Sequence, residues 1–147
     1  MRKFTTAILL GLIVAGCAEY LPMPSGALEG RVQPLPLSLD RITQDKIIQL
    51  ETGTSEAYSV NLWVVEVAGY LHVFAGDNKA TWVENIEEKS NVRLRSGDEI
   101  FELEATRVTD PEVFDLFSAA WEAKYGNRPQ NENVEQTYLY RLRPRNL

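Results

Sequence analysis

One cysteine and one histidine are the side chains of this chain best suited to nucleophilic, acid–base or metal chemistry. Cys17 lies near the N-terminus, and His72 lies within an apolar run far from it in the sequence. A zinc site needs three or four clustered ligands, and a serine triad needs a histidine beside both a serine and an acid. We therefore predict no metal site and no disulfide, and the sequence assigns no catalytic residue.

Cys17 follows a stretch that is typical of a bacterial lipoprotein signal peptide. Arg2 and Lys3 give a positive start, and residues 7–14 are apolar but much shorter than the roughly 20 residues that cross a bilayer. The run Val14-Ala15-Gly16-Cys17 resembles a lipobox, which implies cleavage before Cys17 and acylation of its thiol and its new amine. Each buried acyl methylene is worth about 0.8 kcal/mol, so three chains would anchor the protein firmly. The alternative is a buried free cysteine in an N-terminal helix.

This interpretation divides the chain into three parts. Residues 1–16 are the signal peptide, residues 17–38 are the lipidated cysteine with a proline-rich tether, and residues 39–147 are one domain. The tether region also holds Leu28, Val32, Leu35 and Leu37, so part of it could pack. Cys17 is not followed by the aspartate at the second position that by resemblance to enterobacterial sorting retains a lipoprotein in the inner membrane. We therefore expect the periplasmic face of the outer membrane, with the inner membrane as the alternative.

The negative net charge argues against nucleic acid and anionic lipid as partners. Removal of residues 1–16 leaves 131 of 147 residues, keeps all 21 acidic side chains and lowers Lys+Arg from 15 to 13, so the formal charge falls from -6 to -8. Such a surface repels nucleic acid and gains nothing from anionic lipid. A hydrophobic content of 44% argues against disorder and for one domain with a packed core.

Alternating apolar side chains and turn residues predict a mainly β domain with two helices. We expect strands over residues 46–51, 60–67, 70–75, 91–95, 99–108 and 134–143. We expect helices over residues 79–89, capped by residues 76–78, and between Asp110 and Gly126, with a helical turn at residues 40–45. The strand over residues 60–67 is apolar on both faces, which predicts a position inside the sheet.

The side-chain pattern of residues 91–95 and 99–108 specifies how these two expected strands pair as a hairpin. If Leu94 faces Phe101, then Arg93 lies opposite Glu102, and that cross-strand pair is worth at most about 1 kcal/mol. A slip of one residue would put Leu94 against Glu102 and bury a charge, so the register is well specified. Six antiparallel strands in this order are consistent with a small barrel.

Several short motifs resemble one superfamily. They are YLHVFAG at residues 70–76, then Lys79, Trp82 and Asn85, then NVRL at residues 91–94, and finally RLRP at residues 141–144. This pattern resembles the split β-barrel superfamily of pyridoxamine-phosphate-oxidase-like and deazaflavin-dependent reductase proteins. The resemblance covers roughly residues 47–144 and implies a six-stranded antiparallel split β-barrel that forms homodimers. FMN or deazaflavin would lie in a groove between the subunits.

The resemblance also implies a site. The turn residues Gly53, Thr54 and Ser55 would cradle a phosphate, Lys79 would be the phosphate-binding lysine, and Trp82 and Asn85 would line the groove. The sequence departs from the pattern at two places: residues 53–56 lack the basic residue of deazaflavin-binding relatives, and residues 59–62 lack the arginine of the oxidases. A phosphate needs cations or N–H donors, and Lys79 alone beside acidic neighbours supplies little.

Each candidate residue also has a structural interpretation. Lys79 is consistent with a solvated lysine in a first helical turn, and Trp63, Trp82 and Trp121 with core packing. His72 fits a partly buried structural histidine as well as a proton donor near a ring. Two functions remain: an envelope lipoprotein whose split barrel is a binding or structural module, and an FMN- or deazaflavin-binding oxidoreductase. A small barrel that holds a lipid or peptide is a third interpretation.

Overall fold

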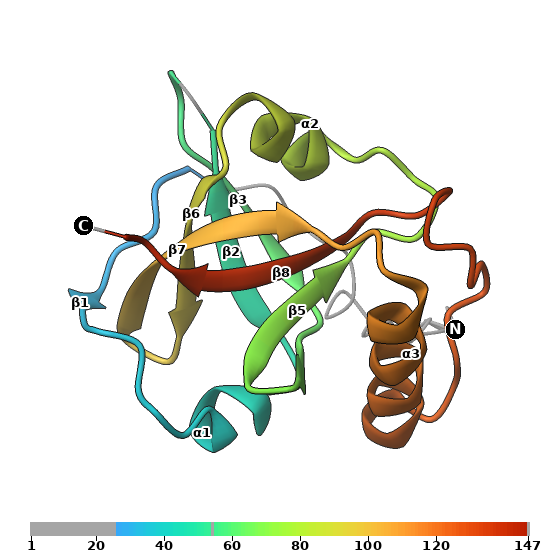
Figure 1. Cartoon of the computed structure of the whole chain (residues 1–147). Coiled ribbons are helices and arrows are strands. Elements are labelled where there is room, and N and C mark those ends of the chain that lie inside the picture. The colour runs from blue at the N-terminus through green and yellow to red at the C-terminus, as the bar shows by residue number, and fades with distance from the viewer. Residues whose placement is uncertain (1–25, 54, 147) are drawn as a thin grey trace, which may run out of the picture.

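The architecture is a curled β-sheet with a helix at each end and a third helix on its outer face (Figure 1). The computed structural model describes residues 26–53 and 55–146. The strands are β1 (Arg31–Val32), β2 (Ile48–Thr52), β3 (Tyr58–Leu62), β4 (Val65–Val67), β5 (Tyr70–Phe74), β6 (Asn91–Ser96), β7 (Glu99–Arg107) and β8 (Leu139–Pro144). The helices are α1 (Asp40–Thr43), α2 (Thr81–Glu88) and α3 (Pro111–Tyr125).

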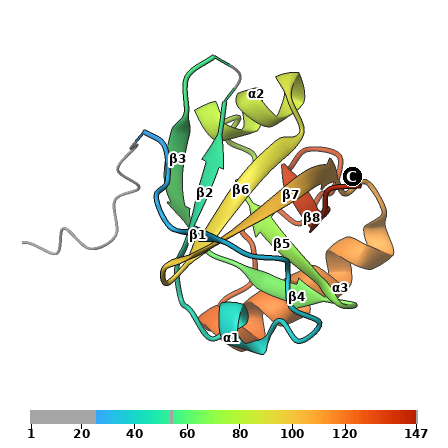
Figure 2. The same ribbon diagram turned by 90° about the vertical axis from the view of Figure 1, so that its left-hand side faces the viewer.

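The order of the strands explains the curl. Neighbours follow the path β3-β2-β6-β7-β8-β5-β4, and β1 pairs in parallel with β7 outside this path. β3 and β4 lie at opposite ends of the path, although only Trp63 and Val64 separate them in the chain. The sheet therefore bends until its two edges meet at this corner, a curl that Figure 2 shows from the side.

The expected single strand over residues 60–67 is wrong in two respects. It is divided at the corner, and its halves are the edges of the sheet rather than its interior. Its side chains are apolar on both faces because Val64 enters the barrel core, whereas Val65 and Val67 pack outward beneath α3. This division and the additional strand β1 raise the number of strands from the expected six to eight among the described residues. α1, which was expected as a helical turn, is a third helix beside the two that were expected.

Two side chains at the end of α3 satisfy the backbone of the corner. The Val64 N–H donates to the Tyr125 hydroxyl at 3.0 Å, and the Lys124 ammonium donates to the Val64 carbonyl at 2.7 Å. The same groups donate to the chain before β2, from Tyr125 to the Lys46 carbonyl at 2.9 Å and from Lys124 to the Asp45 carbonyl at 2.7 Å. Burial lowers the pKa of Lys124 and raises the pKa of Tyr125. α3 thus ties the corner to the start of β2.

The register expected for the hairpin of β6 and β7 is confirmed. Leu94 lies opposite Phe101, and Arg93 lies opposite Glu102. The guanidinium of Arg93, however, turns to the neighbouring strand β2 and meets a carboxylate oxygen of Glu51 at 3.0 Å. The register followed from the burial pattern, but the ion pair depends on a strand that is distant in sequence.

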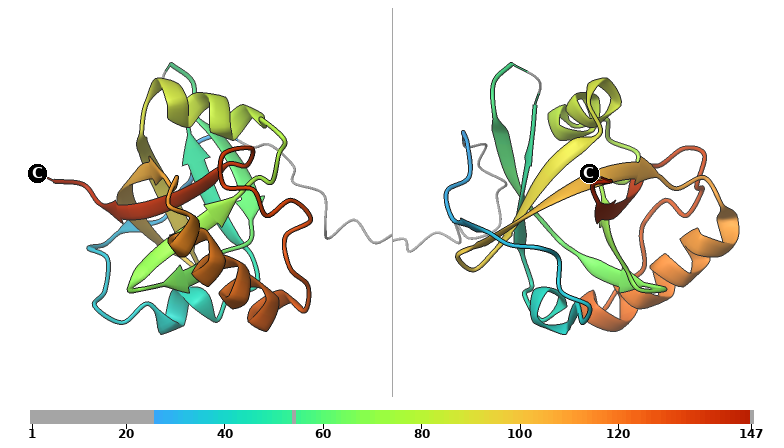
Figure 3. Two further views of the ribbon diagram at one scale, coloured as in Figure 1. Left: turned by 45° about the vertical axis from the view of Figure 1, so that its right-hand side comes forward. Right: turned by 60° about the vertical axis from the view of Figure 1, so that its left-hand side comes forward.

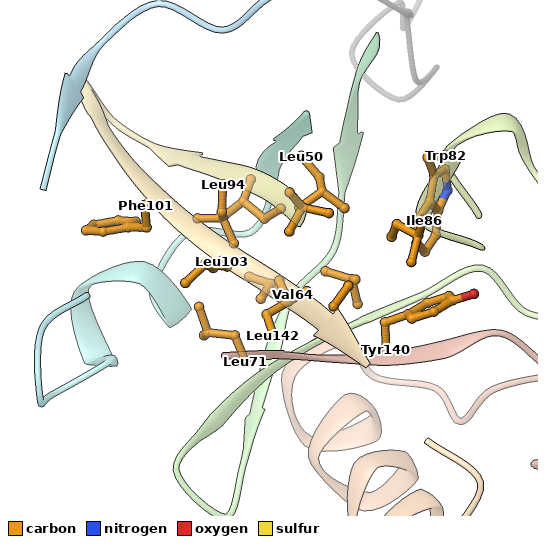
Figure 4. Packing of buried hydrophobic residues seen from close by; sticks show 14 of the residues in the cluster. Leu50, Val64, Leu71, Trp82, Ile86, Leu94, Phe101, Leu103, Tyr140 and Leu142 are labelled. Carbon is orange, nitrogen blue, oxygen red and sulfur yellow. The ribbon is translucent and has the colours of Figure 1, made fainter. Parts of the chain in front are cut away.

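The interior of the curled sheet is the main core. Figure 4 shows side chains such as Leu71, Leu94, Leu103 and Leu142 converging from several strands. α2 lies at one end of the sheet and α1 at the other, as both views in Figure 3 show. Each helix adds apolar side chains to this core: Trp82, Val83 and Ile86 from α2, and Ile42 from α1. Full burial of such a side chain contributes about 1.5–3 kcal/mol, so the helices close the barrel ends by packing.

The ends of the two longer helices differ in how well the sequence predicted them. Asp110 caps α3 by accepting from the Glu112 N–H at 2.9 Å, and Gly126 ends it with φ 87°, as expected. The cap of α2 was expected at residues 76–78, but its N-cap is Ala80, whose side chain cannot accept a hydrogen bond. Burial of the apolar face therefore positions α2 without a side-chain cap.

α3 and its partners form a second core outside the barrel. The buried side chains of this cluster are Val65, Val67, Val108, Phe114, Phe117, Trp121, Val134 and Leu139. Phe114, Phe117 and Trp121 come from the helix that was expected between Asp110 and Gly126. The last strand, expected over residues 134–143, begins later, at Leu139, because the preceding residues form a turn.

Residues 26–38, in the region expected as a tether, pack on the barrel. The Leu28 side chain is buried, its N–H donates to Glu51 at 2.6 Å, and β1 runs beside β7. Gly30 allows this approach, because a Cβ there would lie 2.6 Å from the Asp98 carbonyl oxygen. Cys17 and the expected signal peptide lie outside the described residues. No helix within residues 26–53 and 55–146 is long and apolar enough to cross a membrane.

Candidate functional site

The predicted phosphate turn lies at the tip between β2 and β3. Gly53 has φ 123°, and a Cβ there would collide with the Glu56 carbonyl oxygen, so the turn requires glycine. Ser55 is exposed in the same turn, and Thr54 lies outside the described residues. The glycine is thus explained by the tight fold of the chain itself.

Lys79 precedes α2 and is engaged by an acid of the same helix. Its ammonium lies 2.5 Å from a carboxylate oxygen of Glu87, and this hydrogen bond raises the pKa of Lys79. Its side chain remains about half exposed. An incoming phosphate would have to compete with the Glu87 carboxylate for this ammonium.

Two further candidates, Trp82 and Asn85, lie on α2. Trp82 is only 3% exposed and meets the Tyr140 ring edge to face at 5.9 Å. Asn85 donates its amide N–H to the Thr52 hydroxyl at 3.0 Å, which ties α2 to the strand that leads into the Gly53 turn. Asn85 therefore lies close to this turn, whereas Trp82 is buried in the core and Lys79 forms an ion pair with Glu87.

Three cations that were not predicted as site residues, Lys89, Arg93 and Arg145, line a hollow together with Gly53. This hollow of about 210 Å³ beside the turn is lined by Glu51, Thr52, Gly53, Lys89, Asn91, Val92, Arg93 and Arg145. Arg93 is held by Glu51, and Arg145 donates to the Val92 and Leu103 carbonyls at 2.9 and 3.1 Å. Their guanidinium groups hold the chain together at this point.

A larger pocket has an aromatic wall. It measures about 540 Å³, and its lining residues come from the corner, the end of β5, α3 and the loop after α3. They are Trp63, Phe74, Ala75, Gly76, Asp77, Trp121, Asn127, Arg128, Pro129, Gln130 and Asn131. We call this the aromatic pocket. Its volume is within the range of small-molecule sites.

The aromatic wall is held rigidly by packing. The Trp63 ring stacks on the Tyr125 ring at 4.1 Å with an interplanar angle of 11°, and it lies 5.1 Å from the Trp121 ring. Phe74 meets Trp121 edge to face at 5.8 Å. Trp121 is buried, whereas Trp63 and Phe74 are partly exposed and can contact a ligand. Such preorganised rings bind at low cost in side-chain entropy.

The polar side of the aromatic pocket consists mainly of amides. Asn127, Gln130 and Asn131 provide neutral donors and acceptors, and Asp77 is the one acid in the lining. The cation, Arg128, lies 2.6 Å from Glu132, and this hydrogen bond raises its pKa. Aromatic faces and neutral amides favour a ring-bearing ligand of low charge over a phosphate ester.

His72 has the structural role that was one of its two interpretations. It is 1% exposed, and its Nδ1 lies 2.9 Å from the Tyr70 carbonyl oxygen. Burial lowers the pKa of His72 to about 4, so the ring is neutral at pH 7. Nδ1 must then carry the proton to make this bond. No group of three His, Cys, Asp or Glu side chains that could hold a metal ion lies within residues 26–53 and 55–146.

Known proteins match this chain in structure rather than in sequence. No protein-family model matches it, and no curated protein matches it in sequence. ChuZ of Campylobacter jejuni superposes with a TM-score of 0.59 at 12% identity, over 72% of this chain and 50% of ChuZ. This chain thus spans half the length of ChuZ.

Two further solved structures resemble a larger share of their own chains. HutZ, the heme storage protein of Vibrio cholerae, has a TM-score of 0.53 at 17% identity over 74% of this chain and 89% of HutZ. An FAD-binding protein of Mesorhizobium loti has a TM-score of 0.52 at 14% identity over 73% of this chain and 86% of its own. The fold implied by the resemblance is confirmed: this chain folds as a split β-barrel, as these solved structures do.

Proposed function

We propose that this split-barrel chain is a ligand-binding module of the bacterial envelope and that its ligand occupies the aromatic pocket. The fold supports a binding role, because HutZ is a heme storage protein and the Mesorhizobium loti protein binds FAD. The pocket supports a ligand with a flat or cyclic apolar part, which would lie against Trp63 and Phe74, while Asn127, Gln130 and Asn131 fix its polar edge.

The engagement of Lys79 by Glu87 is the observation that carries this proposal. A phosphate cofactor needs cations that are free to turn toward it, whereas the Lys79 ammonium is already paired with the Glu87 carboxylate on the following helix α2. On β3, where flavin-binding oxidases carry an arginine, Ser59 is fully buried and donates to the Gly26 carbonyl at 2.8 Å. We therefore favour a binding protein that has lost most of its phosphate-binding cations over an oxidoreductase.

A flavin, deazaflavin or haem ligand is the second candidate. The two structural neighbours that bind FAD or store heme favour it, and the aromatic wall suits a planar ring. In this case the ring would lie on Trp63 and Phe74, and its phosphate or propionate groups would compete with Glu132 for Arg128. Such competition predicts weak binding of the charged cofactors.

Spectroscopic titration of the purified protein separates the two candidates. We expect no ligand absorbance in the protein as isolated and no change on titration with FMN, deazaflavin or haem up to micromolar concentrations. A stoichiometric cofactor in native mass spectrometry would instead establish the second candidate. Trp63→Phe, which keeps an aromatic ring, should weaken binding of the natural ligand, whereas Trp82→Phe serves as a buried control outside the pocket.

We also propose that the domain is held at the periplasmic face of the outer membrane through lipid on Cys17. The lipobox-like run before Cys17 supports this proposal. Labelled palmitate should enter the wild-type protein but not Cys17→Ser, and the variant should be released from the membrane fraction. Label in both proteins would refute lipidation at Cys17.

The split-barrel resemblance supports a homodimer, which native mass spectrometry would detect as twice the chain mass.

A further inference from the structure

The charge of the aromatic pocket depends on two of its lining residues. Among the described residues that line it, Asp77 is the one acid and follows β5, and Arg128 is the one cation and lies in the loop after α3. The sign of the charge that the pocket accepts depends on which of these two groups is free to act on a ligand.

The charge of Arg128 is balanced by its own neighbours. Its guanidinium lies 2.6 Å from Glu132, 3.4 Å from Glu122 and 3.5 Å from Asp115. Three carboxylates around one guanidinium leave a formal surplus of two negative charges. An anionic ligand would have to displace one of these acids while the other two repel it.

The Asp77 carboxylate, in contrast, is free to act on a ligand. It is exposed, and no hydrogen bond or ion pair joins its side chain to another residue within residues 26–53 and 55–146. The formal charge of -6 on the whole chain acts in the same direction. The pocket therefore favours a cation, and added salt should weaken the attraction because Asp77 is open to solvent.

The rings of the lining select the kind of cation. An aromatic face is the negative side of the ring quadrupole, and tryptophan attracts cations most strongly. Trp63 and Phe74 line the pocket and are partly exposed, and their rings lie 5.1 and 5.8 Å from that of Trp121. A compact ammonium is strongly hydrated, whereas a charge spread over an N-alkylated ring loses less hydration on contact with such faces.

From these charges and rings we infer that the ligand of the aromatic pocket is a flat organic monocation whose charge is spread over an N-alkylated ring, as in an N-methylpyridinium. The ring lies against Trp63 and Phe74, and the Asp77 carboxylate balances its charge. This inference rests on the proposed binding function and adds to it the sign of the charge that the ligand carries.

Three compounds of nearly the same shape test the charge on the purified full chain. Nicotinamide methylated at its ring nitrogen is a cation, meta-toluamide is its neutral isostere with carbon in place of that nitrogen, and meta-toluate is an anion. In calorimetric titrations the cation should bind about fivefold more tightly than meta-toluamide, and meta-toluate should bind more weakly than both. Amide chemical shifts in a nitrogen-labelled sample should change at Trp63, Phe74 and Asp77 with the cation.

Two outcomes would overturn the inference in different ways. Equal affinity for the cation and meta-toluamide, with shifts at the aromatic pocket, would refute the positive charge and leave the pocket as a ligand site. If no probe binds, or if the shifts are confined to residues outside the lining, both the inference and the proposed site are refuted.

Two substitutions separate the carboxylate from the rings. Asp77→Asn, on an exposed residue, should lower the affinity for the cation about threefold and leave that for meta-toluamide unchanged. Phe74→Leu keeps an apolar side chain but removes an aromatic face, so the preference for the cation over meta-toluamide should fall. Glu88→Gln removes an exposed carboxylate of α2 outside the pocket and is the matched control. A preference for the cation that survives both pocket substitutions would refute the inference.

Discussion

Removal of a single hydroxyl from Tyr125 tests how the barrel is closed. The Tyr125 hydroxyl accepts from the Val64 N–H at 3.0 Å and donates to the Lys46 carbonyl at 2.9 Å. Tyr125→Phe keeps the ring and its stacking on Trp63, so the substitution isolates these hydrogen bonds. Val64 is fully buried, and its N–H would be left without a partner. We expect a loss of about 1–3 kcal/mol in the free energy of unfolding.

Urea denaturation measures this loss, and hydrogen exchange locates it. The midpoint should fall with an unchanged slope, because the same surface is exposed on unfolding. Exchange at the Val64 amide should accelerate more than exchange in β7, since the opening is local to the corner. Tyr70→Phe on an exposed residue is the control. A loss below about 0.5 kcal/mol in Tyr125→Phe, which is the usual scatter of surface substitutions, would refute the view that α3 closes the corner.

Three further predictions concern the residues proposed from sequence. Trp82→Ala should cost about 3–5 kcal/mol in the free energy of unfolding, because Trp82 is buried in the barrel core, whereas Lys79→Ala should leave the urea midpoint unchanged. Neither change should alter ligand binding, and a loss of binding in Lys79→Ala would restore the phosphate site. His72 has a folded pKa of about 4 against 6.5 in the unfolded chain, so its contribution is present above pH 6.5 and is lost as the pH falls toward 4. His72→Leu should therefore flatten the pH dependence of stability in that window by up to about 3 kcal/mol, and an unchanged profile in the urea midpoints would contradict a neutral buried ring. Asp110→Ala should cost about 1 kcal/mol by loss of the cap on the Glu112 N–H, and an unchanged midpoint would show that Pro111 suffices to start α3.

The parts of the fold that depend on local patterns were predictable. Asp110 and Gly126 delimit α3 because capping chemistry acts within one turn of the residue concerned. The hairpin register followed from Leu94 and Phe101, because a one-residue slip would set Leu94 against Glu102 and bury a charge. These predictions needed no knowledge of which strands meet in space.

The corner between β3 and β4 was not predictable from the same patterns. A period of two along residues 60–67 reads as one strand, and a bend adds no turn residue to the sequence, since Trp63 and Val64 are both good strand formers. What makes the bend stable is the supply of polar partners to Val64 by Lys124 and Tyr125, which come from the far end of α3. Only the three-dimensional arrangement shows that these residues act together.

The same corner explains why the candidate pocket lies elsewhere than the site that the resemblance implied. The resemblance located the cofactor residues at the Gly53 turn and along residues 79–85, where Trp82 packs in the core and Lys79 pairs with Glu87. The aromatic pocket instead joins Trp63 at the corner to Trp121 on α3, and the two rings lie 5.1 Å apart only because the chain bends there. Sequence spacing identified both tryptophans as packing residues, and they do pack on each other. The rest of the pocket lining comes mainly from the loop of residues 127–131. A pocket assembled from a corner, a helix and a loop therefore has no signature along the chain.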